Sequence, residues 1–424
     1  MSRQLVAIAL AAACAGCVEN LTTPGVCPEF CPPGQITAVD TVLRDVVRGD
    51  SAFRGYVQAY EAAVMRAASL PGEIDSRAVF RTTALPARVR LAVDTTSGAV
   101  VGVDSLQLKL VLPARDTAAR DLALVFHRIP RTVDSTTTFA DLAPDFAAPP
   151  IRIIYLDSLI ALPGQRDTIT GDSVAVDSSG VVTLLVSLDS VDVGWTEADS
   201  GRIGLGIGAA ADTLTGSGRP SVLIGAGDQG PVITWFAKVD SLGFATVARG
   251  IGGGAAFDSY VFDQGAVALD STLAVGSAPS ARSLLRFARP AALFDSAQIV
   301  RATLILVPES PPIGTVADSF RVVAQRVLTD LGSKSPLAGP AFPGDQSFFG
   351  AAFVHPGSAD TVRIDVTDVV RRWQADTIAP TAVMLRADPE GGSFGEVRFA
   401  PSRNASRRPA LQVTYVPLFP FGQP

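Results

Sequence analysis

The sequence is poor in the side chains on which many enzymes and metal sites depend. It has only two histidines, His127 and His355, in 424 residues, and all four cysteines lie within the first 31 positions. A structural zinc ion needs four nitrogen or sulfur ligands, and no H-E-x-x-H motif occurs. No G-x-S-x-G serine motif lies in the strand-turn-helix setting that it requires. We therefore predict a non-catalytic protein with no metal and no cofactor.

Extended basic blocks and long apolar runs are also missing. The formal net charge is −6, so a nucleic-acid partner is not expected. No apolar run approaches the roughly 18 residues that a membrane-spanning helix needs. If the protein is held at a membrane, another kind of anchor must hold it.

The N-terminus supplies such an anchor. Arg3 precedes an apolar run over residues 5–13, as in a secretion signal. The following Ala15-Gly16-Cys17 looks like the end of a bacterial lipobox, which predicts that residues 1–16 are removed and that Cys17 carries the lipid. Cys14 is a weaker candidate. Val18 stands where an inner-membrane retention signal would have aspartate, so we expect an exported protein anchored to the cell envelope, at the outer membrane.

The other two cysteines, Cys27 and Cys31, fall in the proline-rich stretch CPEFCPP. In an oxidising compartment this spacing predicts a small local disulfide within a tether spanning residues 17–37. A zinc site is the sharper alternative, but both histidines are far away in the sequence.

The rest of the chain is patterned as β-strands. In TVRIDV (361–366) and LQVTY (411–415) apolar residues alternate with polar ones, as in strands with one buried face. One helix is expected where Val366, Val369, Val370 and Trp373 follow helical spacing, with Thr367 or Asp368 as its N-terminal cap. All-β is the predicted class, and Trp373 is expected in the core.

Six segments recur in the same order along the chain, which predicts two homologous β-modules. The matched pairs are 53–57 with 257–261, 76–81 with 282–287, 106–113 with 302–308, 121–129 with 318–327, 186–195 with 364–373, and 216–225 with 405–414. We expect modules at 38–236 and 243–417, a linker at 237–242 and a tail at 418–424.

The second module resembles a known family, the DNRLRE domain or carbohydrate-binding module family 96. The resemblance covers about 165 residues and is carried by DSYV (258–261), LAVG (273–276), RSLLRF (282–287), IVRATLILVP (299–308), IDVTDVVRRW (364–373) and RFAPSRNASRRPALQVTY (398–415). It implies a jelly-roll-like antiparallel β-sandwich. For some members it also implies binding of a polysaccharide such as alginate.

A local excess of arginine in this module suggests where an anionic glycan would bind. The arginine side chain is a planar fork that suits the carboxylates of a uronic-acid polymer. The candidate residues are Arg386, Arg398, Arg403, Arg407 and Arg408, with Tyr260 and Phe394 as stacking aromatics. In the alternative interpretation these arginines pair with neighbouring acids on the sandwich surface or line a loop. Tyr415 is a further aromatic candidate, but we expect it in the core.

Three functions follow, in order of preference. The first is a binding or scaffold lipoprotein that recognises polysaccharide. The second is a structural envelope protein that packs against a protein partner, and the third is a polysaccharide-degrading enzyme built on a pair among the 41 acidic residues. GAGDQG (225–230) matches a dinucleotide-binding pattern, but Pro231 and a strand-like segment follow it, so we interpret it as a turn. Structural calcium lacks the D-x-D-x-D-G spacing that would support it.

Overall fold

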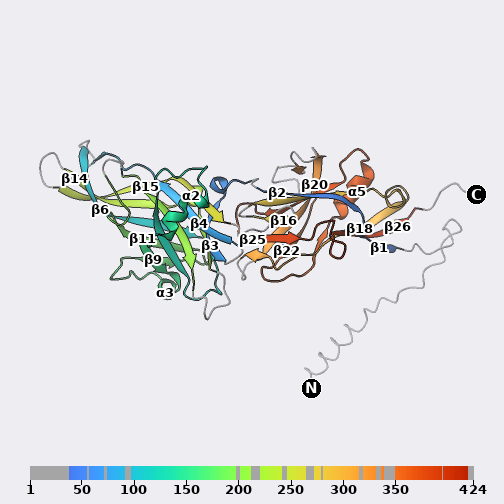
Figure 1. Ribbon diagram of the computed structural model, residues 1–424, viewed down its shortest axis with the longest axis horizontal. Coiled ribbons are helices and arrows are strands. Elements are labelled where there is room, and N and C mark those ends of the chain that lie inside the picture. Colours follow the sequence, from blue (N-terminus) through green and yellow to red (C-terminus); the bar gives the residue numbers. More distant parts are fainter. Residues whose placement is uncertain are drawn as a thin grey trace, which may run out of the picture. The chain divides into compact units, whose positions relative to one another are not determined.

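The structure is a computed structural model that is predominantly β, as the sequence pattern predicts (Figure 1). It describes residues 38–418 except 55–56, 71–73, 91–96, 197–200, 212–219, 241–245, 264–271, 278–279, 315–318, 331–335, 339–348 and 394. The predicted signal, lipidation site, disulfide and tether and the candidate Phe394 lie outside these residues. Within them, no helix combines the length and apolar character needed to cross a bilayer.

Residues 59–263, which we name the inserted module, form a continuous path of antiparallel strands. Its order is β10 (Ser173–Val176), β11 (Val182–Asp189), β6 (Ser97–Leu112), β14 (Val232–Asp240), β15 (Thr246–Asp263), β4 (Ile74–Thr82), β12 (Gly204–Ala210), β8 (Ala123–Ile129) and β9 (Arg152–Tyr155). Residues 246–254 of β15 pair with β14, and residues 255–263 pair mainly with β4. The long strand β15 therefore belongs to both halves of the path.

Shorter elements complete the inserted module. Strands β3 (Val64–Leu70) and β13 (Ser221–Gly225) pair with each other, and β3 continues the sheet from β4. The remaining elements are η1 (Ala59–Glu61), β5 (Arg88–Arg90), β7 (Ala114–Arg115), α2 (Phe139–Ala147), α3 (Leu156–Ile160) and η3 (Gly227–Gln229). Because η3 is a single turn that leads into β14, the turn interpretation of GAGDQG is confirmed.

The path has two halves, β10-β11-β6-β14 and β4-β12-β8-β9, which β15 joins. Alternate residues of the two halves share one hydrophobic core, which makes the inserted module a sandwich. Buried side chains of one half include Leu106, Leu108, Leu184 and Trp235, and those of the other include Phe80, Phe126 and Leu205. The side chains between these positions point outward, so β11, β6 and β14 also present an outer face.

Residues 39–54 and 273–417 form a second sandwich, which we name the split module. Its smaller sheet has the order β23 (Val362–Asp365), β18 (Ala297–Leu306), β26 (Ala410–Pro417) and β1 (Val39–Leu43). Its larger sheet contains β2 (Val47–Arg54), β17 (Ala281–Phe287), β24 (Ala382–Asp388), β20 (Phe320–Asp330) and β22 (Phe349–Val354), with β16 (Leu273–Gly276), β25 (Gly395–Phe399), β19 (Ile313–Gly314) and β21 (Pro336–Ala338). The short helix α4 (Ala291–Phe294) precedes β18.

The predicted helix is α5 (Thr367–Ala375), and its buried residues are Val369, Val370 and Trp373. Trp373 is 1% exposed, and its ring centroid lies 5.3 Å from that of Phe287, so its place in the core is confirmed. The expected cap is wrong. Asp365 Oδ1 accepts the backbone N–H of Thr367 at 2.9 Å, while the Thr367 hydroxyl accepts the backbone N–H of Ala302 at 2.9 Å and so fixes the helix to β18.

The two modules share one strand order. In the split module β23, β18 and β26 occupy the places of β11, β6 and β14, and β17, β24, β20 and β22 occupy those of β4, β12, β8 and β9. Strands β16 and β25 likewise correspond to β3 and β13. The two halves of β15 correspond to β1 and β2, respectively.

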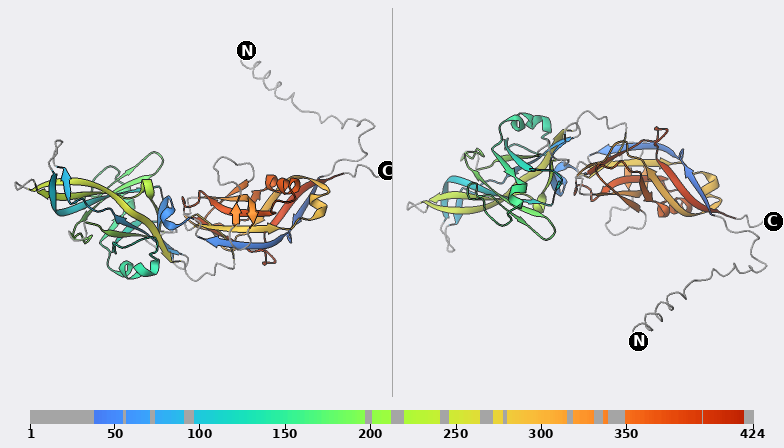
Figure 2. Two further views of the ribbon diagram at one scale, coloured as in Figure 1. Left: turned by 90° about the horizontal axis from the view of Figure 1, so that it is seen from above. Right: turned by 90° about the horizontal axis from the view of Figure 1, so that it is seen from below.

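Strand pairing divides the chain differently from the expected boundaries. Strand β2, at the start of the expected 38–236 module, pairs with β17, and β15, at the start of the expected 243–417 module, pairs with β4. Residues 237–240 of the expected linker belong to β14. Figure 2 shows the blue N-terminal strands among the orange and red ones. Each repeat has thus exchanged its leading strands with the other, so the inserted module lies in sequence within the split one.

Five of the six matched segments lie on corresponding strands, and the sixth pairing is wrong. Residues 216–225 lead into β13, whose counterpart is β25, whereas residues 405–414 contain part of β26, whose counterpart is β14. An Arg-Pro dipeptide occurs in both segments and favoured the wrong alignment. The corresponding stretches are VITW after Pro231 and LQVT after Pro409.

Candidate functional site

The predicted arginines engage different partners instead of forming one open site. Arg386 bonds Asp388 at 3.3 Å, and Arg408 bonds Asp45. Arg407 donates to the Glu309 carbonyl at 3.4 Å. Acids therefore neutralise Arg386, Arg408 and Arg398, as the alternative interpretation expects.

Arg398 belongs to a buried ion cluster around Glu396, whose side chain is 5% exposed. Glu396 receives a two-pronged contact from Arg54 at 2.7 and 2.9 Å and one from Arg398 at 2.7 Å. Burial alone would raise the pKa of the carboxyl, but hydrogen bonds and charge from the two arginines outweigh it and hold that pKa below its ordinary value. The cluster joins β2 to β25 and is structural.

Arg403 is the predicted arginine that lines a hollow. The cavity is about 240 Å³ and lies against Asp50, Thr272 and Pro401. The backbone N–H of Ser402 donates to Asp50 at 2.5 Å, so β2 again closes this region.

The predicted stacking residue Tyr260 is not accessible. It is 3% exposed on β15, in the core of the inserted module. The guanidinium carbon of Arg66 lies 5.7 Å from the centre of its ring, and burial lowers the pKa of Arg66 to about 10. The assignment of Tyr260 to a ligand surface was wrong, because Ser259, Tyr260 and Val261 are all buried.

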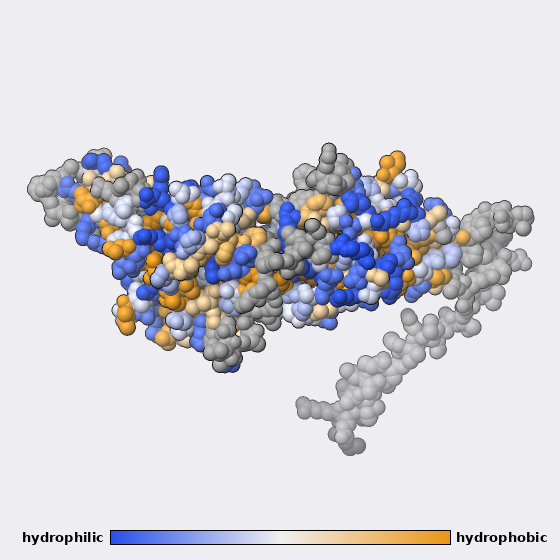
Figure 3. Space-filling view, in the orientation of Figure 1, coloured by the Kyte–Doolittle hydropathy of each residue, from blue (hydrophilic) through white to orange (hydrophobic). Residues whose placement is uncertain are grey.

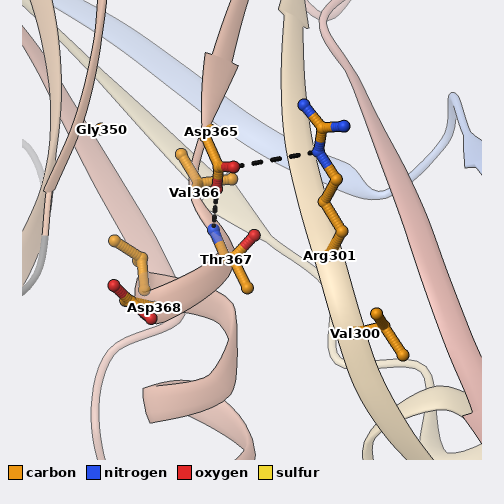
Figure 4. A pocket seen from close by; sticks show the side chains of 8 residues that line it. Val300, Arg301, Gly350, Asp365, Val366, Thr367 and Asp368 are labelled. Atoms are coloured by element: carbon orange, nitrogen blue, oxygen red, sulfur yellow. Dashed lines mark hydrogen bonds and ion pairs between the residues drawn. The ribbon is translucent and has the colours of Figure 1, made fainter. Parts of the chain in front are cut away.

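The split module has a pocket of about 530 Å³ on its smaller sheet (Figure 4). Val300 and Arg301 of β18 line one side, and Asp365, Thr367 and Asp368 line the other. Arg301 Nε lies 3.8 Å from Asp365 Oδ2, and both side chains are more than half exposed. The guanidinium is therefore weakly held and open to a ligand.

Gly350 of β22 also lines this pocket. A Cβ atom at position 350 would lie 1.6 Å from the backbone oxygen of Asp365. Only glycine allows β22 to approach β23 this closely, and the approach shapes the pocket wall.

The inserted module has a pocket of about 540 Å³ on the outer face of β11, β6 and β14. Asp189, Ser105 and Phe236 lie side by side on these three strands. Phe236 is 42% exposed. Asp192 adds another carboxylate, and Arg152 together with the 166–171 turn forms the opposite wall.

That opposite wall is fixed by its own bonds. Arg152 pairs with buried Asp172 at 2.5 Å, and Arg166 Nε donates to the Gly171 carbonyl at 3.1 Å. Asp167 accepts the backbone N–H groups of Thr170 and Ile169, both at 2.8 Å, and these bonds hold the pKa of its carboxyl below the ordinary value. The wall is therefore preorganised in the absence of a ligand.

The two pockets occupy corresponding places in the two modules. Each lies on the outer face of the smaller sheet, where β11 or β23 ends, and each is also bordered by the corresponding strand, β9 or β22. The linings differ: an arginine dominates the split-module pocket, whereas the inserted-module pocket has the exposed aromatic. The sequence analysis predicted neither pocket. A signal was present, because Ile233 and Trp235 are apolar residues two positions apart in β14, and if they face the core then Phe236 must face outward.

Neither pocket contains a histidine or cysteine. His127 lies in β8, is 7% exposed, and its ring centroid is 6.0 Å from that of Phe146. Burial lowers the pKa of His127. Among the residues that the structure describes, no group of three His, Cys, Asp or Glu side chains is placed to hold a metal ion. The arrangement in both pockets suits ligand binding.

Comparison with known proteins found no matching protein-family model and no matching curated protein.

Proposed function

We propose that the protein is a non-catalytic lipoprotein of the cell envelope that binds polysaccharide through its two β-sandwich modules. The lipid on Cys17 would hold it at the membrane, outside the described residues. The observation that carries the proposal is the recurrence of an outer-face pocket at corresponding positions of two modules with different linings.

The chemistry of the pockets supports a carbohydrate ligand. Sugar hydroxyls both donate and accept hydrogen bonds, and Thr, Asp and Arg side chains line both hollows, with Ser side chains added in the inserted module. For the split module, the family resemblance implies an anionic glycan such as alginate, and Arg301 is the cation that faces its pocket. The surface in Figure 3 mixes apolar and polar residues on the visible face, so that face offers no broad apolar area for a protein partner.

Affinity electrophoresis of the mature chain, with Cys17 replaced by serine, tests the proposal. We expect gels containing a suitable polysaccharide to retard it, and Arg301→Ala to reduce the retardation if the split-module pocket takes part. Arg363→Ala is the matched control, because Arg363 lies on the neighbouring strand β23 outside the pocket. Unchanged mobility in alginate, pectin and neutral glucan gels alike would overturn the proposal.

A further inference from the structure

The pocket of the inserted module discriminates by charge. Its lining contains three carboxylates, Asp167, Asp189 and Asp192, and two guanidinium groups, Arg152 and Arg166. Arg152 is already paired with Asp172, and Arg166 is bonded to the Gly171 carbonyl. A carboxylate-bearing sugar would therefore meet uncompensated negative charge in this pocket.

Two of the carboxylates are available to accept hydrogen bonds from a ligand. Asp167 is occupied by its own turn, but within the described part of the chain the side chains of Asp189 and Asp192 have no hydrogen bond or ion pair. Both residues are exposed. Carboxylate oxygens accept from hydroxyl donors, and neutral sugars supply several such donors on adjacent carbons.

Phe236 provides an apolar platform beside these acceptors. Its ring is 42% exposed, and its cross-strand neighbours are Ser105 on one side and Gly250 on the other. Further along β15, a Cβ atom at Gly252 would meet nothing within 4 Å, so the space above this glycine is open. Among the described side chains of β15, no large one therefore covers the Phe236 ring from this side.

We propose that this pocket is a subsite for an uncharged hexopyranose of a neutral polysaccharide. The apolar face of the sugar ring lies on Phe236, and hydroxyl groups of the sugar donate to Asp189 and Asp192. The inference rests on the proposed function and deepens it, because it gives the inserted module a ligand class different from the anionic glycan that resemblance implies for the split module.

The test compares Phe236→Ala with Phe353→Ala in the mature chain, using affinity electrophoresis in gels of neutral glucan, neutral mannan and alginate. Phe353 is the matched control, because it is 64% exposed on β22 and lines neither pocket. We expect a neutral polysaccharide to retard the unaltered chain. Phe236→Ala should weaken that binding about tenfold, which corresponds to about 1.4 kcal/mol, and Phe353→Ala should leave it unchanged.

The charge of the pocket is tested with Asp189→Asn. An amide keeps an acceptor oxygen but loses the charge, so we expect weaker binding of the neutral polysaccharide. Because both side chains are exposed, Phe236→Ala and Asp189→Asn should keep the unfolding temperature of the unaltered chain.

The outcomes separate the two proposals. Retardation by alginate alone, or equal neutral binding by the Phe236→Ala and unaltered chains, would overturn this inference and leave the proposed function standing. Unchanged mobility in every gel would overturn both.

Discussion

At the scale of single residues, the most informative side chain is Glu396, because three charges meet where water is nearly absent. Its pKa is held below the ordinary value of 4.5, so its ionised form stabilises the fold. That stabilisation is fully present above pH 4.5 and is lost as the pH falls through the lower folded-state value. The free energy of unfolding should therefore begin to decline as the pH falls below 4.5.

Glu396→Gln should lower the free energy of unfolding at pH 7 by about 3 kcal/mol, because Arg54 and Arg398 would face each other without a neutralising charge. It should also flatten the pH dependence below 4.5. Chemical denaturation between pH 3 and 7 measures both effects. Glu61→Gln, at an exposed position, is the control, and equal stability of the two variants would refute a structural role for the ion cluster.

The burial of single residues was predicted correctly from the sequence where a clear helical or alternating pattern of apolar residues assigns them to the core. Helical spacing placed Trp373 in the core, and alternation placed Val362 and Ile364 inward. Prediction failed for Tyr260, which lies between buried Ser259 and buried Val261 in a stretch of β15 without alternation of buried and exposed residues. Arg66 shows the same limit, since a charged residue buried to 1% exposure contradicts the usual preference of arginine for the surface.

At the scale of elements, the contact between β22 and the end of β23 depends on the missing side chain of Gly350. Gly350→Ala should destabilise the split module by about 3 kcal/mol or more, because the new Cβ would overlap the backbone oxygen of Asp365. Gly252→Ala, where a Cβ has free space, should change stability by no more than about 0.5 kcal/mol.

Thermal unfolding of the two glycine variants provides the measurement. The same substitution in strands of the two modules gives a matched comparison, because both replace a strand glycine with the smallest side chain. Similar unfolding temperatures for the two would show that β22 can move away from β23 at little cost.

Element-scale prediction identified strands such as β23 and β26 but not their neighbours. Local alternation determines that TVRIDV and LQVTY are strands, yet pairing is decided by contacts between residues hundreds of positions apart. The leading strand pairs with corresponding strands in the two modules: β2 pairs with β17, and β15 pairs with β4. The local pattern of a leading strand does not indicate which of these two partners it will take. The two pockets were missed for the same reason, since each is assembled from at least three separate segments.

At the scale of the whole molecule, the exchange of leading strands determines which pieces can fold. A chain of residues 243–417 lacks β1 and β2, although β2 pairs with β17 from Phe287 to Ala281. We expect that fragment to be poorly soluble and to lack a cooperative thermal transition. Residues 38–57 joined by a flexible linker to 272–418 should fold, because they restore both strands.

Circular dichroism melting of the two shortened chains decides between the arrangements. If residues 243–417 melted cooperatively alone and the joined chain did not, β15 would be the native partner of β17, and the tandem boundaries expected from the sequence would hold.

The exchange also changes what a protease would achieve. The inserted module is joined to the rest of the chain at two places, residues 55–58 and 264–272. A cut in the second leaves the inserted module covalently continuous with β2, β1 and the N-terminal segment. A cut in the first leaves it attached to the C-terminal strands, which remain hydrogen-bonded to β2. Release of the intact inserted module therefore requires two cleavages, so in the proposed lipid-anchored protein the fold would protect against loss through a single nick.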